Sequence, residues 1–195
     1  KALADGLAGW HKAPAYTRVP DPYREVPPQR FDIDTPDKAN AFYLARMPLA
    51  LRDTDADFPA LYLANFLLGT SETSRLWHRV RETDGLSYNV RSTLSVSSFE
   101  PTASWTVYAI YAPQNRARLE SAIKEELARA LKDGFTQAEV KDGIVALLNY
   151  RNLARAQDDV VANTWLNYLR TDRTFAWSAE MDKKIAALTP ATVNA

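Results

Sequence analysis

Few side chains in this sequence have the types and spacing that could do chemistry. His78 and Glu82 stand four residues apart, the spacing that brings two metal ligands to one face of a helix. A zinc site needs more clustered ligands than these, yet the only other histidine is His11 and cysteine is absent. We therefore interpret His78 as a solvated helical residue and predict that this chain binds no catalytic metal.

The signatures of other enzyme classes are also missing. The sequence has no glycine-rich phosphate loop, no Gly-x-Ser-x-Gly elbow and no cysteine nucleophile, so nucleotide binding and serine or cysteine hydrolysis lack support. Asp53, Asp55 and Asp57 stand together, but we interpret them as caps at a helix start, where the helix dipole favours acidic residues. Most tryptophans and tyrosines fall on apolar faces, where core packing explains them.

Length and charge limit the possible partners. Lysine plus arginine and aspartate plus glutamate number 24 each, so no net field favours nucleic acid or an anionic membrane. No apolar run approaches the roughly 20 residues that cross a bilayer. The 195 residues suffice for one compact core. We therefore predict no nucleic acid partner and no membrane span.

The N-terminal residues indicate a connection between domains. Residues 2–10 resemble the end of a helix, and five of the eleven prolines fall within residues 14–28, a composition that favours extended backbone. We interpret residues 1–28 as a helix end with a Pro-rich linker, and residues 29–195 as the folded domain. Thr189 and Pro190 begin a further helix close to the last residue, so we expect the final helix and strand to be truncated.

The order of the expected elements predicts an α+β domain. Apolar runs bounded by prolines predict strands over residues 30–35 and 39–47, and period-two alternation predicts a strand over 86–96 that pairs antiparallel with 103–112. Helical spacing predicts helices over residues 55–68, 74–83 and most of the chain from 115 onward. Strands followed by helices are typical of a two-layer fold, in which helices pack on one face of a mostly antiparallel sheet.

Capping residues predict where several helices begin and end. Gly69 marks the end of the helix over residues 55–68. Thr136 with Glu139 makes a capping box for a helix after Gly134, and Asp158 or Asp159 is expected to cap a later one.

One stretch of sequence is more specific than any of these features. It reads Asn65-Phe66-Leu67-Leu68-Gly69, then Thr73-Ser74-Arg75-Leu76-Trp77, then Val80-Arg81-Glu82-Thr83-Asp84-Gly85-Leu86-Ser87-Tyr88-Asn89-Val90. This stretch resembles the C-terminal half of the insulinase/pitrilysin metallopeptidases, where a leucine-rich helix ending in glycine precedes Ser-Arg-Leu, Arg-Glu and Gly-Leu-Ala-Tyr. More loosely, the resemblance extends over residues 31–195 in the order of the elements.

The resemblance implies one half of a clamshell enzyme, with the fold of a mitochondrial-processing-peptidase half domain. In that family one half carries an inverted His-x-x-Glu-His zinc motif, and the other carries an Arg and a Tyr seven residues apart. Arg81 and Tyr88 have that separation, whereas His-x-x-Glu-His is absent here. The resemblance therefore implies a substrate-binding, non-metal half, with zinc in a partner half on the same polypeptide or on another subunit.

Peptide hydrolysis gives the two residues a reason to be together. Attack on a peptide carbonyl places negative charge on its oxygen, and donors fixed in a dry cleft stabilise that charge without reorganising. Arg81 offers a permanent charge and a planar fork, and Tyr88 offers a neutral phenol hydrogen. The alternation of the strand, however, places Tyr88 on the same face as Leu86 and Val90, where burial in the core would explain it without any function.

Three functions stay open from the sequence. The first is the substrate-binding half of a zinc endopeptidase that acts on short or unfolded peptides, with this chain inactive by itself. The second is a non-catalytic scaffold or assembly subunit of the same fold, and the third is a peptide-binding protein without catalysis. The resemblance and the absence of cysteine together favour a periplasmic location.

Overall fold

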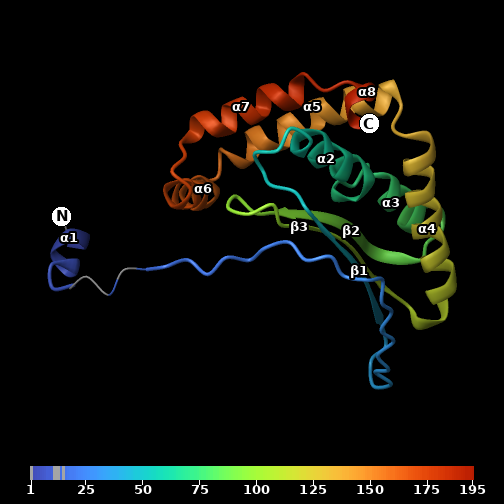
Figure 1. Ribbon diagram of the computed structural model, residues 1–195. Helices are drawn as coiled ribbons and strands as arrows, with labels where there is room; N and C mark the ends of the chain where they lie inside the picture. The colour runs from blue at the N-terminus through green and yellow to red at the C-terminus, as the bar shows by residue number, and fades with distance from the viewer. Residues whose placement is uncertain (1, 11–13, 15) are drawn as a thin grey trace.

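A computed structural model describes residues 2–10, 14 and 16–195 of the chain, so His11 lies outside the described residues. Its sheet is antiparallel, with the strands in the order β1-β3-β2. The strands are β1 (Ala41–Leu49), β2 (Ser87–Val96) and β3 (Ala103–Tyr111). Helices cover one side of the sheet, and an extended N-terminal segment runs past the other side (Figure 1). The predicted α+β fold with helices on one face is therefore confirmed.

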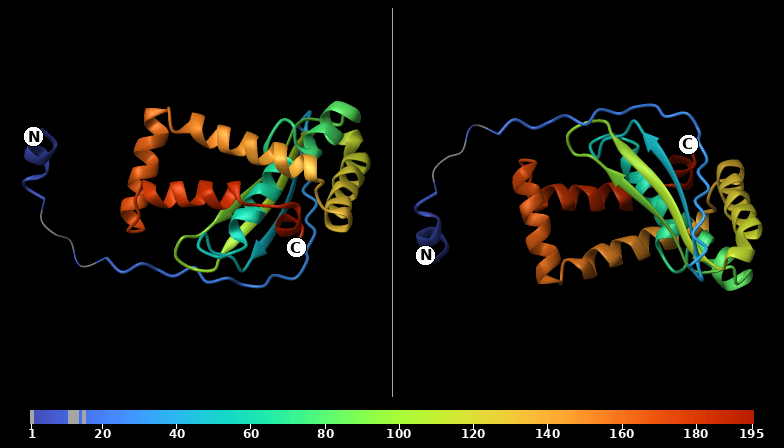
Figure 2. Two further views of the ribbon diagram at one scale, coloured as in Figure 1. Left: turned by 90° about the horizontal axis from the view of Figure 1, so that it is seen from above. Right: turned by 90° about the horizontal axis from the view of Figure 1, so that it is seen from below.

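The helices lie close to the predicted positions, and two of them widen into π-helical turns. The elements before β2 are α1 (Ala2–Leu7), α2 (Phe58–Asn65) with its continuation η1 (Phe66–Thr70), and α3 (Arg75–Trp77) with its continuation η2 (His78–Thr83). Those after β3 are η3 (Pro113–Asn115), α4 (Arg116–Asp133), α5 (Gln137–Ala154), α6 (Asp158–Arg170), α7 (Phe175–Ala186) and α8 (Pro190–Val193). α5 and α7 extend beyond the sheet, and α6 joins their far ends (Figure 2). Among the described residues, the helices lack the combination of length and hydrophobicity that spanning a bilayer requires.

The first π-helical turn brings the helix against β2. A side chain at Gly69 would clash with Ser92, because an added Cβ would lie 2.8 Å from the Ser92 backbone nitrogen. The Oδ1 atom of buried Asn65 accepts hydrogen bonds from Ser92 Oγ and Trp105 Nε1, both at 2.8 Å. The sequence indicated Gly69 as a helix stop. In the structure the helix instead continues through Gly69 to Thr70. Glycine is required at this position by the close contact with the sheet and not by the end of a helix.

Two apolar clusters hold the layers together. The first lies between the sheet, α3, η2 and α4, and its buried members include Leu76, Trp77, Val80, Val90, Val107, Leu119 and Ile123. The second joins the helices to one another, and its buried members are Leu63, Phe66, Phe135, Val140, Leu147, Met181 and Ile185. The first cluster therefore fixes η2 relative to β2, the two elements that carry Arg81 and Tyr88.

The extended N-terminal segment follows the margin of the domain and is tied to it by polar contacts. Thr102 Oγ1 donates a hydrogen bond of 2.7 Å to the Asp21 carbonyl, and Arg30 pairs with Glu120 of α4 at 3.1 Å. The predicted strand over residues 30–35 is wrong, since these residues join no ladder and the side chains of Phe31 and Ile33 are 78% and 83% exposed. A strand-like composition forms a strand only where a partner strand is available.

Two predicted caps are also wrong. α6 begins after Gln157, and Asp158 and Asp159 lie inside its first turn. There the helix dipole favours the two carboxylates, although neither side chain caps the helix. Asp53 is no cap either, because it pairs with Arg173, whose Nη1 and Nη2 atoms lie 2.6 and 2.8 Å from its two carboxylate oxygens.

The capping box of α5 is confirmed and also ties α5 to α3. The Glu139 side chain accepts from the Thr136 backbone nitrogen at 2.8 Å, and Thr136 Oγ1 accepts from the Glu139 nitrogen. Arg75 donates to both oxygens of the same carboxylate, at 2.7 and 2.9 Å. The Arg75 hydrogen bonds, opposed by partial burial and reinforced by Thr136, lower the pKa of Glu139 to about 2.

This pairing predicts a pH dependence of stability. Because the pKa of Glu139 in the folded chain lies below its ordinary value of 4.5, its contribution is complete above that value and is lost as pH falls toward about 2. Urea denaturation between about pH 5 and about pH 2 should show a smaller loss of stability in Glu139→Gln than in the unaltered protein. The control Glu180→Gln, which removes an exposed carboxylate paired with Lys183, should follow the unaltered protein. If the free energy of unfolding fell equally with pH in all three proteins, the stabilising role of the Glu139 carboxylate would be contradicted.

Candidate active site

Tyr88 stands on a β-bulge near the start of β2. The pairing of β2 with β3 shifts between Ser87 and Asn89, which leaves Tyr88 as the extra residue. The Tyr88 side chain is 80% exposed, whereas Leu86 and Val90 on either side are buried in the core. The prediction that Tyr88 shares a face with these two residues is therefore wrong, because the bulge interrupts the alternation of the strand. Core burial no longer explains this tyrosine.

The bulge is held by the residues that precede Tyr88. Buried Ser87 donates from its Oγ to the Ile110 carbonyl at 2.6 Å and accepts from the Asn89 backbone nitrogen at 3.2 Å. This side chain replaces ladder hydrogen bonds that the extra residue removes. Gly85 forms the turn from η2 to β2 with a φ of 61°, a backbone conformation that favours glycine. The turn and the bulge together direct Tyr88 back toward η2.

The Arg81 guanidinium lies against two aromatic rings. Its Cζ atom is 4.5 Å from the centroid of the Tyr88 ring and 4.1 Å from that of Trp77. Both distances lie within the range of a cation–π contact. Arg81 is half-buried and Tyr88 is exposed, so the pair stands at the protein surface. The structure thus brings together Arg81 and Tyr88, the two site residues that we predicted from the sequence.

The hydrogen-bond donors of this pair are not used within the described part of the chain. Neither the Arg81 guanidinium nor the Tyr88 hydroxyl makes a hydrogen bond or ion pair with residues 2–10, 14 or 16–195. Arg79, two residues before Arg81, differs in this respect, because it pairs with Asp84 at 2.7 Å and with Glu125 at 2.9 Å. A half-buried guanidinium beside a phenol, both with free N–H and O–H groups, can bind an oxygen that carries negative charge.

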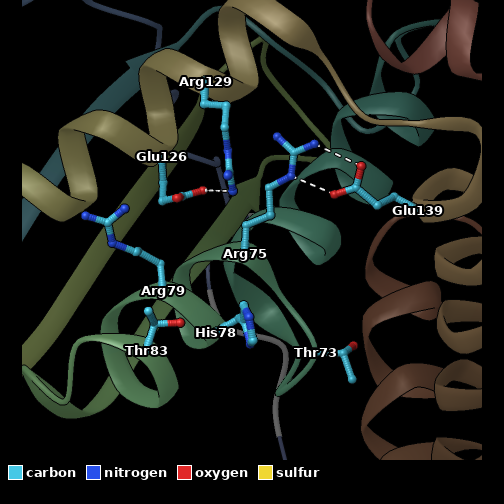
Figure 3. Close-up of a pocket in the computed structure, with 8 residues that line it drawn as sticks. All are labelled: Thr73, Arg75, His78, Arg79, Thr83, Glu126, Arg129 and Glu139. Carbon is cyan, nitrogen blue, oxygen red and sulfur yellow. Dashed lines mark hydrogen bonds and ion pairs between the residues drawn. The ribbon is translucent and has the colours of Figure 1, made fainter.

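A pocket lies elsewhere among the described residues. It has a volume of about 440 Å³ and lies between α3, η2, α4 and the start of α5, and neither Arg81 nor Tyr88 lines it. Figure 3 shows the residues that do. Its charged groups already have partners: Arg75 pairs with Glu139 and Arg129 with buried Glu126, and Arg79 pairs with Asp84 and Glu125 outside the pocket. We therefore place the candidate site at the unpaired donors rather than in this pocket.

His78 and Glu82 form a local pair on η2. His78 Nδ1 lies 2.6 Å from a Glu82 carboxylate oxygen, and the His78 side chain is 72% exposed. Within the described residues, no three His, Asp or Glu side chains gather where a metal ion could be held. The groups in this part of the chain therefore do not fit a zinc site.

The fold and the stretch within residues 65–90 that resembles the insulinase/pitrilysin family point to one class of protein, the half domains of zinc peptidases. The sequence matches the family described as the peptidase M16 inactive domain over residues 2–147, and the chain belongs to that family. It is 38% identical over 82 residues to an uncharacterized zinc protease of Mycobacterium leprae and 37% identical over 82 residues to one of Bacillus subtilis. Each alignment covers 42% of this chain, but only 18% and 20% of the two relatives. The chain thus spans about a fifth of the relatives that it matches.

Solved structures show the same fold. A protease from Helicobacter pylori superimposes with a TM-score of 0.71 at 16% identity, over 82% of this chain and 38% of that chain. A peptidase M16 inactive domain from Pseudomonas fluorescens superimposes with a TM-score of 0.67 at 20% identity, over 80% of this chain and 37% of that chain. These likenesses extend over most of the chain, so they support the fold of the whole domain.

Sequence reasoning missed two residues of the site. Trp77 and Arg91 lie next to the predicted pair, since the Cζ atoms of Arg81 and Arg91 are both 4.1 Å from the centroid of the Trp77 ring. The spacing of Trp77 and Arg81, four residues on one helix, was a signal that could have found the first contact. Nothing in the spacing of Arg91 indicated that it would reach the same ring.

Proposed function

We propose that this chain is the substrate-binding, non-metal half of a zinc-dependent endopeptidase, and that Arg81 and Tyr88 bind the carbonyl oxygen of the bond that is cut. The contact between the Arg81 guanidinium and the Tyr88 ring is the observation on which the proposal depends. The two side chains lie 4.5 Å apart, Cζ to ring centroid, with their donors unused by the described residues. The family of the chain, whose relatives are named zinc proteases, supplies the context.

The residues present support different roles for the two halves, with the metal in the partner half and substrate binding in this chain. A zinc ion bound in the partner half would supply a Lewis acid and an activated water. The residues of this chain then hold and stabilise the substrate, because the described part contains no cluster of metal ligands. The partners of this chain are therefore a peptide or unfolded polypeptide and the zinc-bearing half, on the same polypeptide or on a separate subunit.

Arg81 and Tyr88 contribute differently to binding the carbonyl oxygen. A guanidinium stays charged at every working pH and gains attraction as negative charge grows on the oxygen. A phenol donates a short, directed hydrogen bond without adding a second positive charge. Both contacts strengthen as the carbonyl becomes tetrahedral, so they lower the barrier more than they tighten substrate binding.

The sheet beside Tyr88 suits an extended peptide. Phe42 of β1 stands opposite Ile110 of β3, and Ile110 stands opposite Asn89 next to the bulge. The side chains of Phe42, Leu44 and Ile110 are 61%, 58% and 41% exposed. They give this face of the sheet exposed apolar side chains, against which apolar side chains of an unfolded substrate can pack.

The main alternative is a non-catalytic scaffold subunit of the same fold. A scaffold gains nothing from holding an exposed phenol over a guanidinium whose donors are left unused, and placing Tyr88 there requires a bulge and a left-handed glycine. This arrangement favours the peptidase over the scaffold. The periplasmic location stays a prediction.

Hydrolysis of an unfolded protein tests the proposed function. The complete protein, supplied with its zinc-bearing half, should cleave casein, lose that activity with 1,10-phenanthroline and regain it with added zinc. The isolated chain of residues 1–195 should cleave nothing. A complete protein that binds casein without cutting it would favour a peptide-binding role. Chelator-sensitive cleavage by the isolated chain would overturn the assignment of the metal to the partner half.

A further inference from the structure

The indole of Trp77 lies under the Arg81 guanidinium, and we propose that Trp77 is a positioning residue that fixes Arg81 beneath Tyr88. This inference rests on the proposed function, because the placement of Arg81 matters only if Arg81 acts on the substrate. It adds a residue that touches neither substrate nor metal and that acts through Arg81.

Trp77 has a fixed place of its own. Its side chain is 7% exposed and belongs to the apolar cluster between the sheet, α3, η2 and α4. Trp77 ends α3 and Arg81 follows four residues later on η2, so the two side chains lie on the same side of a continuous helical stretch. The Arg81 Cζ atom stands 4.1 Å from the ring centroid. A rigid ring therefore lies directly against a flexible side chain.

A ring positions an arginine without using its donors. Arg75 shows the alternative, since it is held by Glu139 and by the Gly134 carbonyl through the same N–H groups that could otherwise bind a ligand. A stacked ring contacts the face of the guanidinium and leaves the N–H groups at its edge free. Positioning by Trp77 is thus compatible with the unused donors of Arg81, whereas positioning by a carboxylate would not be.

The same ring also links the two elements that carry the site. Arg91 of β2 lies 4.1 Å from the Trp77 centroid, and its Nη2 atom is 3.5 Å from Glu72. Contacts between cations and rings therefore run from Arg91 to Trp77, from Trp77 to Arg81 and from Arg81 to Tyr88. This series joins the π-helical turn to the strand, so removing the Trp77 ring loosens Arg81 relative to Tyr88.

A double-mutant cycle in the complete protein tests the inference. Trp77→Met, which fills much of the space without an aromatic face, should lower kcat for peptide hydrolysis by about tenfold with little change in KM. Trp77→Phe, which keeps a ring, should stay within about threefold of the unaltered protein. In an Arg81→Ala background, Trp77→Met should change kcat by less than about twofold, because its effect passes through Arg81.

Each other outcome of this cycle has a definite meaning. An equal loss of kcat from Trp77→Met with and without Arg81 would show that Trp77 supports only the fold, and the inference would be wrong. If Arg81→Ala alone leaves kcat unchanged, the proposed function fails before the role of Trp77 is reached. The control Trp177→Leu removes a ring of α7 that lies 4.5 Å from the Cζ atom of Arg173, and it should leave kcat unchanged.

A second measurement does not depend on how well a Trp77 variant folds. The ¹⁵N order parameter of Arg81 Nε in the complete protein, assigned as the signal lost in Arg81→Ala, should approach that of ion-paired Arg75. It should clearly exceed that of exposed Arg170. An Arg81 side chain as mobile as Arg170 would overturn the inference.

Discussion

Replacing Arg81 by alanine in the complete, zinc-bearing protein should lower kcat/KM for peptide hydrolysis by about a hundredfold. The loss is large because the guanidinium binds the carbonyl oxygen most strongly when negative charge has grown on it, and no other side chain takes its place. Most of the loss should appear in kcat, since a contact that strengthens along the reaction affects the barrier more than ground-state binding.

Two matched variants make this prediction sharp. Arg81→Lys keeps the charge but loses the planar fork that stacks between Trp77 and Tyr88, so it should recover only part of the activity. Arg118→Ala removes an exposed arginine of α4 and should leave kcat/KM unchanged. Full activity in Arg81→Ala would remove the catalytic role that we assign to this residue.

Tyr88→Phe should lower kcat by about a hundredfold as well, although it removes only one oxygen atom. The ring stays against Arg81, so the expected loss reports the phenol hydrogen alone. Because the Tyr88 side chain is 80% exposed and its hydroxyl has no partner within the described residues, the free energy of unfolding should hardly change.

A kinetic assay paired with thermal denaturation checks this second prediction. Tyr150→Phe on α5 is the control, since that tyrosine is 60% exposed and distant along the chain from the bulge. It should leave both kcat and the melting temperature unchanged. A Tyr88→Phe protein that turns over normally would show that the phenol is not a donor in the reaction. A large fall in melting temperature would instead show a structural role.

The sequence predicts most of the fold because its local signals agree with one another. Alternation predicted the hairpin of β2 and β3, and the Thr136 and Glu139 capping box marked the start of α5 to the residue. The strand predicted over residues 30–35 failed for a reason that composition does not express. Phe31 and Ile33 are suitable strand residues, but no neighbouring strand offers them hydrogen bonds.

The candidate site was only partly predictable. The separation of Arg81 and Tyr88 is visible in the sequence, and the family resemblance selected these two residues. Their contact depends on a bulge that adds one residue to β2, and simple alternation predicts the opposite face for Tyr88. The place of Trp77 depends on packing between η2 and the sheet, which the sequence does not show directly.

The central claim is that Arg81 and Tyr88 bind the oxygen of the tetrahedral intermediate, and inhibition by a phosphinic peptide tests it most directly. A phosphinic group imitates that intermediate, so its affinity should follow transition-state binding rather than substrate binding. Across the unaltered protein, Arg81→Lys, Arg81→Ala and Tyr88→Phe, we expect the logarithm of the inhibition constant to rise in step with the logarithm of KM/kcat. An inhibition constant that stays the same in all four proteins would contradict the claim.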